Sequence, residues 1–246
     1  MDLKRLEQVG WRSFRPELFL GEPGRKARNV GPQFVSIVRQ LGAQSVLELC
    51  CGGGKLCLEL AVAGFDTTGI DLDDRMLAFA QAAAASLPRS VQRRVRFQQA
   101  DMCTFDLGQR FDVVILEDDG FVYLLDLQDQ LACLQRVVAH LADDGRFLLN
   151  FNTPQRELYE DHEREFTYDP QTQIKTCHCV WTSLEGDGTP TTVSEGFERR
   201  RLTYPCELEL LLRVAGLTVM ERWGDMKGTP FTNPALQEYH YLCRRT

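Results

Sequence analysis

The chain has 246 residues, of which 43% are hydrophobic and 26% are charged, a composition typical of one α/β domain with a large core. No apolar run is long enough to span a membrane and the first residues lack the apolar stretch of a secretory signal, so a cytoplasmic protein without a membrane partner is expected. The net charge of −7 disfavours nucleic acid as a partner.

The first part of the chain alternates short apolar runs with segments of helical periodicity. Helices are expected at residues 30–41, 55–63, 73–86 and 127–141. Strands are expected at residues 45–50, 67–70, 95–97, 111–116 and 146–151. This alternation predicts βαβ units that form a parallel sheet.

The pattern changes after residue 152. Runs of β-forming residues at 165–168, 174–182 and 191–202 are separated by turn-rich segments and predict an antiparallel insert. A helix at 205–215 then stops at Gly216, and two further strands follow at 217–222 and 238–243. The expected fold class is therefore α/β, with a mostly parallel seven-strand sheet and a small antiparallel insert after the fifth strand.

Nine cysteines raise the question of disulfides or a metal site. Cys57, Cys103 and Cys133 lie in expected core segments, which favours buried free thiols in a reducing compartment. In an expected strand, Cys177 and Cys179 share one face while His178 points away, and no C-x-x-C spacing is present. No metal site is expected, and the acidic run at 117–119 is the one remaining candidate for a divalent ion.

A glycine-rich loop follows the first expected strand. Glu48 lies in that strand, Cys50 and Cys51 end it, and residues 52–54 are all glycine before the next helix begins. Glycines permit positive φ angles and let backbone N–H groups approach a ligand closely. Such a loop alone is weak evidence, because dinucleotide-binding folds and ordinary turns also contain it.

Two acidic residues strengthen the case for a ligand site. Asp71 ends the second strand and Asp101 follows the third, so both are expected at the carboxyl edge of the sheet, where open α/β folds bind ligands. Asp71 is placed to accept hydrogen bonds from two ribose hydroxyls. Asp101 is placed to hold an adenine amino group, with the Met102 side chain over the ring.

Together these features resemble the class I S-adenosylmethionine-dependent methyltransferases. The resemblance rests on the loop at 48–54, Asp71, the triplet at 100–102 and the run at 111–114 leading to Glu117, and it covers about two-thirds of the chain. Cys50 and Cys51 precede the glycines, where the family usually has an acid or alanine. The resemblance implies a Rossmann-like fold and S-adenosylmethionine as the cofactor. The cofactor-binding residues it implies are Glu48, Cys50, Gly52, Gly54, Asp71, Leu72, Asp101, Met102 and Glu117.

The same loop also permits an NAD-binding interpretation. Cys57 stands at the position of the third small residue of that pattern, and Asp71 would supply its acid. In that interpretation, however, Glu48 and the triplet at 100–102 have no role. The sequence therefore favours methyl transfer.

The insert resembles the extra antiparallel sheet of small-molecule N-methyltransferases, in which the N-terminal segment also folds across the site. This implies a lid segment at 1–28, a cofactor-binding core at 29–152, a lid insert at 153–203 and a return to the core sheet at 204–246. The N-terminal segment carries Trp11, Phe14 and Phe19 and a basic cluster at 25–28. The aromatics fit a lid role and plain packing equally well, and the basic cluster fits a solvated helix start or contact with an acidic acceptor.

Methyl transfer from a sulfonium is an in-line displacement, in which the enzyme orients the nucleophile and excludes water. An amine nucleophile must be neutral, so a residue that accepts its proton is expected. Glu117, at the end of the fourth strand, Tyr168 in the insert and His240 in the last strand are the candidate catalytic residues. Tyr239 and Tyr241 share one face of that strand and His240 takes the other.

We expect transfer to a small-molecule acceptor, most simply an amine. The alternatives are an O- or C-methyltransferase of the same fold, a tRNA or protein methyltransferase, and a non-catalytic protein that keeps the fold. The acidic net charge argues against tRNA. The sequence leaves open the identity of the acceptor, the number of methyl groups transferred and the oligomeric state.

Overall fold

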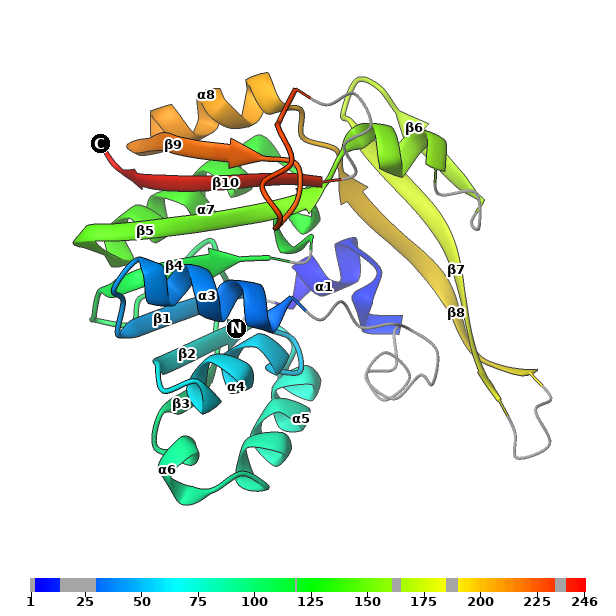
Figure 1. The fold of residues 1–246 in the computed structure, drawn as a ribbon. Helices are drawn as coiled ribbons and strands as arrows, with labels where there is room; N and C mark the ends of the chain where they lie inside the picture. The colour runs from blue at the N-terminus through cyan, green and yellow to red at the C-terminus, as the bar shows by residue number, and fades with distance from the viewer. Residues whose placement is uncertain (1–2, 14–29, 118, 161–164, 185–189, 233–237) are drawn as a thin grey trace.

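The computed structural model describes residues 3–13, 30–117, 119–160, 165–184, 190–232 and 238–246. In these residues a seven-stranded sheet has the order β3-β2-β1-β4-β5-β10-β9 (Figure 1). Its strands are β1 (Ser45–Leu49), β2 (Asp66–Asp71), β3 (Val95–Gln99), β4 (Phe111–Leu116), β5 (Leu141–Asn152), β9 (Leu217–Trp223) and β10 (Glu238–Arg245). Only β10 runs antiparallel to its neighbours, β5 and β9. The predicted α/β fold with a mostly parallel sheet is confirmed.

Helices cover both faces of this sheet, because alternate residues of its buried strands point to opposite sides. Val46 and Val113 face α3 (Gly31–Gln40) and α4 (Lys55–Val62), whereas Leu47 faces the opposite side. That opposite side is covered by α7 (Leu127–His140) and α8 (Pro205–Ala215). The outer strands are flanked by α5 (Asp74–Ala85) and the short α6 (Arg89–Gln92). In the described parts of the chain, no helix has both the length and the apolarity needed to cross a membrane.

Local chemistry sets the helix ends. The Asp126 side chain caps α7 by accepting hydrogen bonds from the N–H groups of Gln128 and Asp129, at 2.8 and 3.2 Å. Helix α8 begins with Pro205 and ends at Gly216, whose φ of 92° lies in the left-handed region. The sequence correctly predicted this stop.

A second sheet, of order β6-β7-β8, stands beside the main one (Figure 1). It is antiparallel throughout and contains β6 (Phe166–Asp169), β7 (Ile174–Leu184) and β8 (Pro190–Arg201), so the expected insert is present. The α1 helix (Lys4–Gln8) and the 3₁₀ turn at Trp11–Ser13 lie between β8 and the main sheet (Figure 1). Phe14, Phe19 and the basic cluster at 25–28 lie outside the described residues, and the four-part division of the chain stays a prediction.

The short helices α1 and α6 and two 3₁₀ turns were not predicted, and two further elements differ from the sequence prediction. Strand β5 begins at Leu141, directly after α7, because Leu141 already pairs with Phe111 of β4 before the apolar run begins. A single π-helical turn, Arg156–Glu160, follows β5 and was not predicted. Such turns are uncommon and are often found at functional sites.

The turn from the glycine loop into α4 generates a stability prediction. Gly54 has a φ of 75°, and a Cβ there would lie 2.5 Å from the Phe97 ring. Gly64 has a φ of 104°, but a Cβ there would have no other atom within 4 Å, which makes it a matched control. We expect Gly64→Ala to cost about 1 kcal/mol from backbone strain alone, and Gly54→Ala about 2–4 kcal/mol because overpacking is added. Urea denaturation measures both, and equal costs would contradict this account of the loop.

Candidate functional site

The residues that follow β1 form a loop at the carboxyl edge of the sheet. Cys50, Gly52 and Gly54 all have positive φ angles, of 56°, 51° and 75°. A positive φ is ordinary for glycine but unusual for cysteine, so Cys50 adopts a strained conformation here. The loop is closed by a hydrogen bond of 2.8 Å from the Gly54 N–H to the Cys51 carbonyl oxygen.

Glu48 supports this loop from beneath. Its buried carboxylate accepts a hydrogen bond of 2.9 Å from the Cys57 N–H, in the first turn of α4. A carboxylate is stabilised there by the free N–H groups and by the helix dipole. The structure therefore shows Glu48 joining β1 to α4.

Asp71 joins the end of β2 to the same loop. Its Oδ2 accepts a hydrogen bond of 2.8 Å from the Gly52 N–H, and its Oδ1 accepts one of 2.8 Å from the Asp73 N–H. Burial raises the pKa of Asp71 to about 6, although these two N–H groups favour the charged form. The Leu72 N–H favours the charged form as well, and since a carboxylate offers about four acceptor sites, Asp71 can still accept from a diol.

Asp101 follows β3 at the same edge. Its Oδ1 accepts a hydrogen bond of 2.8 Å from the Cys103 N–H, and its Oδ2 accepts one of 2.9 Å from Arg5 Nε of α1. Met102 packs partly buried against the main core cluster. Leu72, directly after β2, accepts a hydrogen bond of 3.0 Å on its carbonyl oxygen from the Gln99 side chain. Sequence reasoning missed Arg5, because its partner Asp101 is 96 positions away.

The end of β4 leads into an acidic turn. Glu117 follows β4 and is partly buried, and its carbonyl oxygen accepts a hydrogen bond of 3.2 Å from the Gly120 N–H. Asp119 has a φ of 66° and its carboxylate accepts hydrogen bonds of 2.7 and 2.6 Å from the backbone and side-chain nitrogens of Asn152. These contacts join the ends of β4 and β5. Asp118 lies outside the described residues.

Asp119 also belongs to a buried ionic cluster that joins the two sheets. Arg200 of β8 contacts Asp119 at 3.4 Å, Glu157 at 3.1 Å and Glu198 at 3.0 Å. Lys175 of β7 is fully buried and its Nζ lies 3.2 Å from Glu157 Oε2. Buried charges are tolerated only when they are paired in this way.

Tyr123 extends the cluster toward the N-terminal segment. Its hydroxyl donates a hydrogen bond of 2.6 Å to Glu198 Oε1, and the Trp11 ring packs edge-on against the Tyr123 ring at 5.5 Å. Burial and the nearby Glu198 carboxylate raise the pKa of Tyr123 well above its ordinary value. Tyr123 therefore stays protonated and acts as a donor.

The three predicted catalytic residues lie on three different elements. Glu117 is at the carboxyl edge of the main sheet, directly after β4. Tyr168 lies on β6, where burial and a hydrogen bond with Tyr204 raise its pKa to about 12. His240 is buried within β10 and its Nε2 lies 2.9 Å from Glu238 Oε2. His240 faces the α3–α4 side with Leu242, whereas Tyr239 and Tyr241 face the α7–α8 side, as the alternation predicted.

The expected alternation in β7 is also seen. Cys177 and Cys179 are buried, whereas His178 is exposed and contacts Glu195 at 2.8 Å. Among the described residues, no group of three or more His, Cys, Asp or Glu side chains is arranged to hold a metal ion. His162, another histidine of this region, lies outside them.

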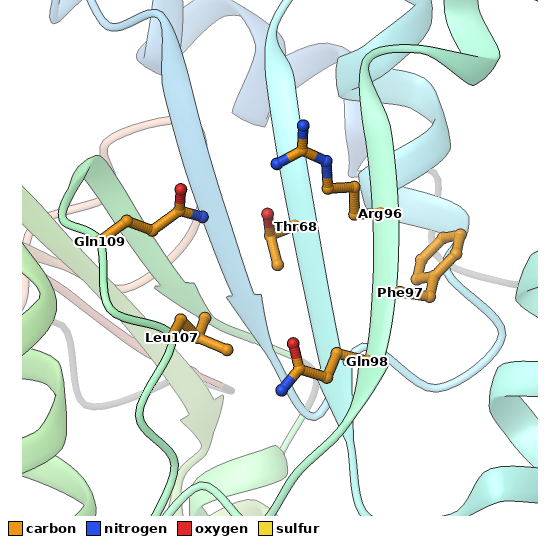
Figure 2. A pocket seen from close by; sticks show the side chains of 6 residues that line it. All are labelled: Thr68, Arg96, Phe97, Gln98, Leu107 and Gln109. Carbon is orange, nitrogen blue, oxygen red and sulfur yellow. The ribbon is translucent and has the colours of Figure 1, made fainter.

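A cavity of about 510 Å³ is lined by none of the predicted site residues. It is on the outer strands of the main sheet, where the connection from β3 to β4 crosses the face as a loop (Figure 2). Its lining residues are Thr68, Arg96, Phe97, Gln98, Leu107 and Gln109. These differ from the predicted site residues, so we do not assign the cavity to the candidate site.

Comparison with known proteins identifies the family of the chain. Residues 46–145 match a family model described as a methyltransferase domain. A protein of Geobacillus sp. (strain WCH70) that is named as a putative methyltransferase is 31% identical over 214 residues, which cover 80% of this chain and 81% of that protein.

Solved structures of similar fold include the CcbJ methyltransferase from Streptomyces caelestis. It has a TM-score of 0.81 and 24% identity, with 94% of this chain and 96% of that chain covered. The glycopeptide N-methyltransferase MtfA in complex with S-adenosyl-L-homocysteine has a TM-score of 0.64 and 22% identity, with 86% of this chain and 87% of that chain covered.

The ionic cluster generates a stability prediction. Arg200→Met leaves three buried carboxylates, those of Asp119, Glu157 and Glu198, without their shared cation. We expect a cost of about 3–5 kcal/mol, the usual result of removing one partner of a buried ion pair. Arg199→Met, at the neighbouring position on the other face of β8, is the control and is expected to cost less than about 1 kcal/mol. Equal losses in urea denaturation would contradict the role of the cluster.

Proposed function

We propose that this chain, which belongs to the class I S-adenosylmethionine-dependent methyltransferases, transfers the methyl group to an amine nitrogen of a small-molecule acceptor. Membership of the family gives the enzyme class and the cofactor, S-adenosylmethionine. The acceptor, the atom methylated and the residues that act on it are our proposal.

The carboxyl edge of the main sheet fits this cofactor. We assign Asp71 to the two ribose hydroxyls, because its carboxylate is held rigidly by two backbone N–H groups and has lone pairs left over. Gly52 and Gly54 give the loop its positive φ angles at the edge of the sheet, and we assign this loop to the methionine part of the cofactor. Asp101 and Met102 are assigned to the adenine amino group and ring. Glu48, Cys50, Leu72 and Glu117 complete the proposed cofactor set.

The observation that carries the amine proposal is the group of acidic residues beside the end of β4. In the described part of the chain, Glu117 directly follows β4, and Asp119 is joined through Arg200 to Glu157 and Glu198. Acidic groups attract ligands of the opposite charge, and an amine is cationic at neutral pH. MtfA, a protein of similar fold, is named as an N-methyltransferase, which supports the same class of acceptor.

The cofactor supplies an electrophilic methyl group, and the residues of the chain bind, orient and deprotonate the acceptor. We assign Glu117 to accept the ammonium proton, since it lies at the carboxyl edge of the sheet directly after β4. Tyr168 remains protonated at neutral pH and is suited to orient the acceptor by hydrogen bonding. His240 is buried against Glu238, so a positioning role fits it better than direct proton transfer.

The assignment of Asp71 predicts a pH dependence of cofactor binding. Ribose hydroxyls donate more strongly to a carboxylate than to a carboxylic acid, so binding favours the ionised form. The affinity for S-adenosylhomocysteine should therefore be constant above pH 7 and fall as the pH decreases through about 6. Below that pH the loss approaches about tenfold per pH unit.

Calorimetric titration between pH 5 and 8 measures this dependence. Asp71→Asn, which has nearly the same shape but no charge, is expected to bind at least about tenfold more weakly at pH 8 and to lose the dependence near pH 6. An unchanged pH profile in Asp71→Asn would remove Asp71 from the site. Titration with NAD is the control for the dinucleotide alternative.

The nature of the acceptor is tested with methyl-labelled S-adenosylmethionine and a panel of small amines. Each amine is paired with its N-acetyl derivative and with the corresponding alcohol. We expect label only in the free amines, with a rate that rises as the pH approaches the amine pKa, because only the neutral amine attacks. Label in the alcohols, or in N-acetyl derivatives that retain other nucleophiles, would indicate an O- or C-methyltransferase instead. Binding of the cofactor without turnover on any acceptor would favour a non-catalytic protein.

A further inference from the structure

The N-terminal segment is fixed between the two sheets by contacts on both sides. On the insert side, the Val9 carbonyl oxygen accepts a hydrogen bond of 3.1 Å from the Arg199 N–H of β8. A Cβ at Gly10 would lie only 1.7 Å from the Phe197 carbonyl oxygen, so the two backbones approach closely there. On the core side, Arg75 Nη2 donates a hydrogen bond of 2.9 Å to the Trp11 carbonyl oxygen. Helix α1 therefore has a defined position at the carboxyl edge of the main sheet (Figure 1).

From this position, Arg5 of α1 reaches two carboxylates of the core at once. Its Nε donates a hydrogen bond of 2.9 Å to Asp101 Oδ2. Its Nη2 donates one of 2.6 Å to Asp129 Oδ1, and its Nη1 donates to Asp129 Oδ2. The side chains of Arg5, Asp101 and Asp129 are only 29%, 16% and 30% exposed, so water screens these contacts weakly. The forked guanidinium serves both carboxylates in fixed directions, which a lysine ammonium could not do.

This arrangement determines the direction of the Asp101 carboxylate. Oδ1 is held by the Cys103 N–H and Oδ2 by Arg5, so the carboxylate is fixed at both oxygens. Each oxygen retains a lone pair for a further donor. Without Arg5, the half-buried Asp101 and Asp129 would repel one another, and the Asp101 side chain would gain by turning toward solvent.

We propose that Arg5 is a positioning residue for cofactor recognition, which holds the Asp101 carboxylate where it accepts a hydrogen bond from the 6-amino group of adenine. The proposal rests on the assignment of Asp101 made under the proposed function. Asp129, in the first turn of α7, anchors the guanidinium and does not itself touch the base. The N-terminal segment thereby becomes part of the cofactor site.

The test changes Arg5 in the protein and the 6-amino group in the ligand, separately and together, and compares the affinities. The probes are S-adenosylhomocysteine and S-inosylhomocysteine, which has an oxygen in place of that amino group. Titration calorimetry gives the ratio of their dissociation constants for the wild type and for Arg5→Met, Arg5→Lys and Asp129→Asn. Lys4→Met is the matched control, because it removes one positive charge from an exposed position of the same helix.

We expect the wild type to bind the adenosyl probe more tightly than the inosyl probe. In Arg5→Met the ratio of the two dissociation constants should fall about tenfold, while the affinity for the inosyl probe changes less than about twofold. Arg5→Lys and Asp129→Asn should lose a smaller part of it, and Lys4→Met none. If Arg5→Met lowered the affinity for both probes equally, or for neither, the proposal would be overturned. If Arg5→Met did not fold, unchanged preference in Asp129→Asn and Arg5→Lys would overturn it in the same way.

The same titrations distinguish the role of Arg5 from the assignment of Asp101 on which it rests. A wild type that binds both probes equally would refute the assignment of Asp101 to the adenine amino group, and the role of Arg5 with it. A wild type that prefers the adenosyl probe, combined with an Arg5→Met variant that keeps the full preference, would refute the role of Arg5 alone.

Discussion

The hydrogen bond from the Gly52 N–H to Asp71 Oδ2, 2.8 Å long, is the contact on which the rest of the site depends. It fixes the loop after β1 against the end of β2, so that the backbone of one strand end and the carboxylate of the next form one rigid surface. Glu48 holds the other side of the loop by binding the first turn of α4. The burial that makes this contact rigid also raises the pKa of Asp71, so the same geometry that places the carboxylate makes its charge sensitive to pH.

The remaining site is built by segments that cross from one sheet to the other. Arg200 and Lys175 of the insert neutralise part of an acidic cluster at the ends of β4 and β5. Arg5 of the N-terminal segment does the same for Asp101. In each case a cation from a peripheral segment pairs with buried carboxylates of the core. Because an unpaired buried carboxylate costs free energy, this pairing holds the segment in place. The peripheral segments and the core thus depend on one another through charge as well as through apolar packing.

The sequence predicted most of the fold because its signals are local. The periodicity of apolar residues placed the strands, the three glycines marked the loop, and Asp71 and Asp101 followed their strands at the expected distance. The end of α8 at Gly216 and the alternation of side chains in β10 were predicted from local signals as well. The ionic cluster and the contacts of Arg5 could not be predicted, since Arg200 meets Asp119 across 81 positions and Arg5 meets Asp129 across 124. A charged residue in a peripheral segment is usually solvated, and only the fold reveals which ones are buried.

The crystal structure of the complex with S-adenosylhomocysteine tests the central claim most directly. The account predicts that both ribose hydroxyls lie within hydrogen-bond distance of the Asp71 carboxylate and that the thioether sulfur points toward Glu117. It also predicts that the Gly52 N–H stays bonded to Asp71, because this hydrogen bond and the contact of Glu48 with α4 hold the loop from both sides. A ribose bound away from Asp71, or a loop that must rearrange to admit the ligand, would contradict it.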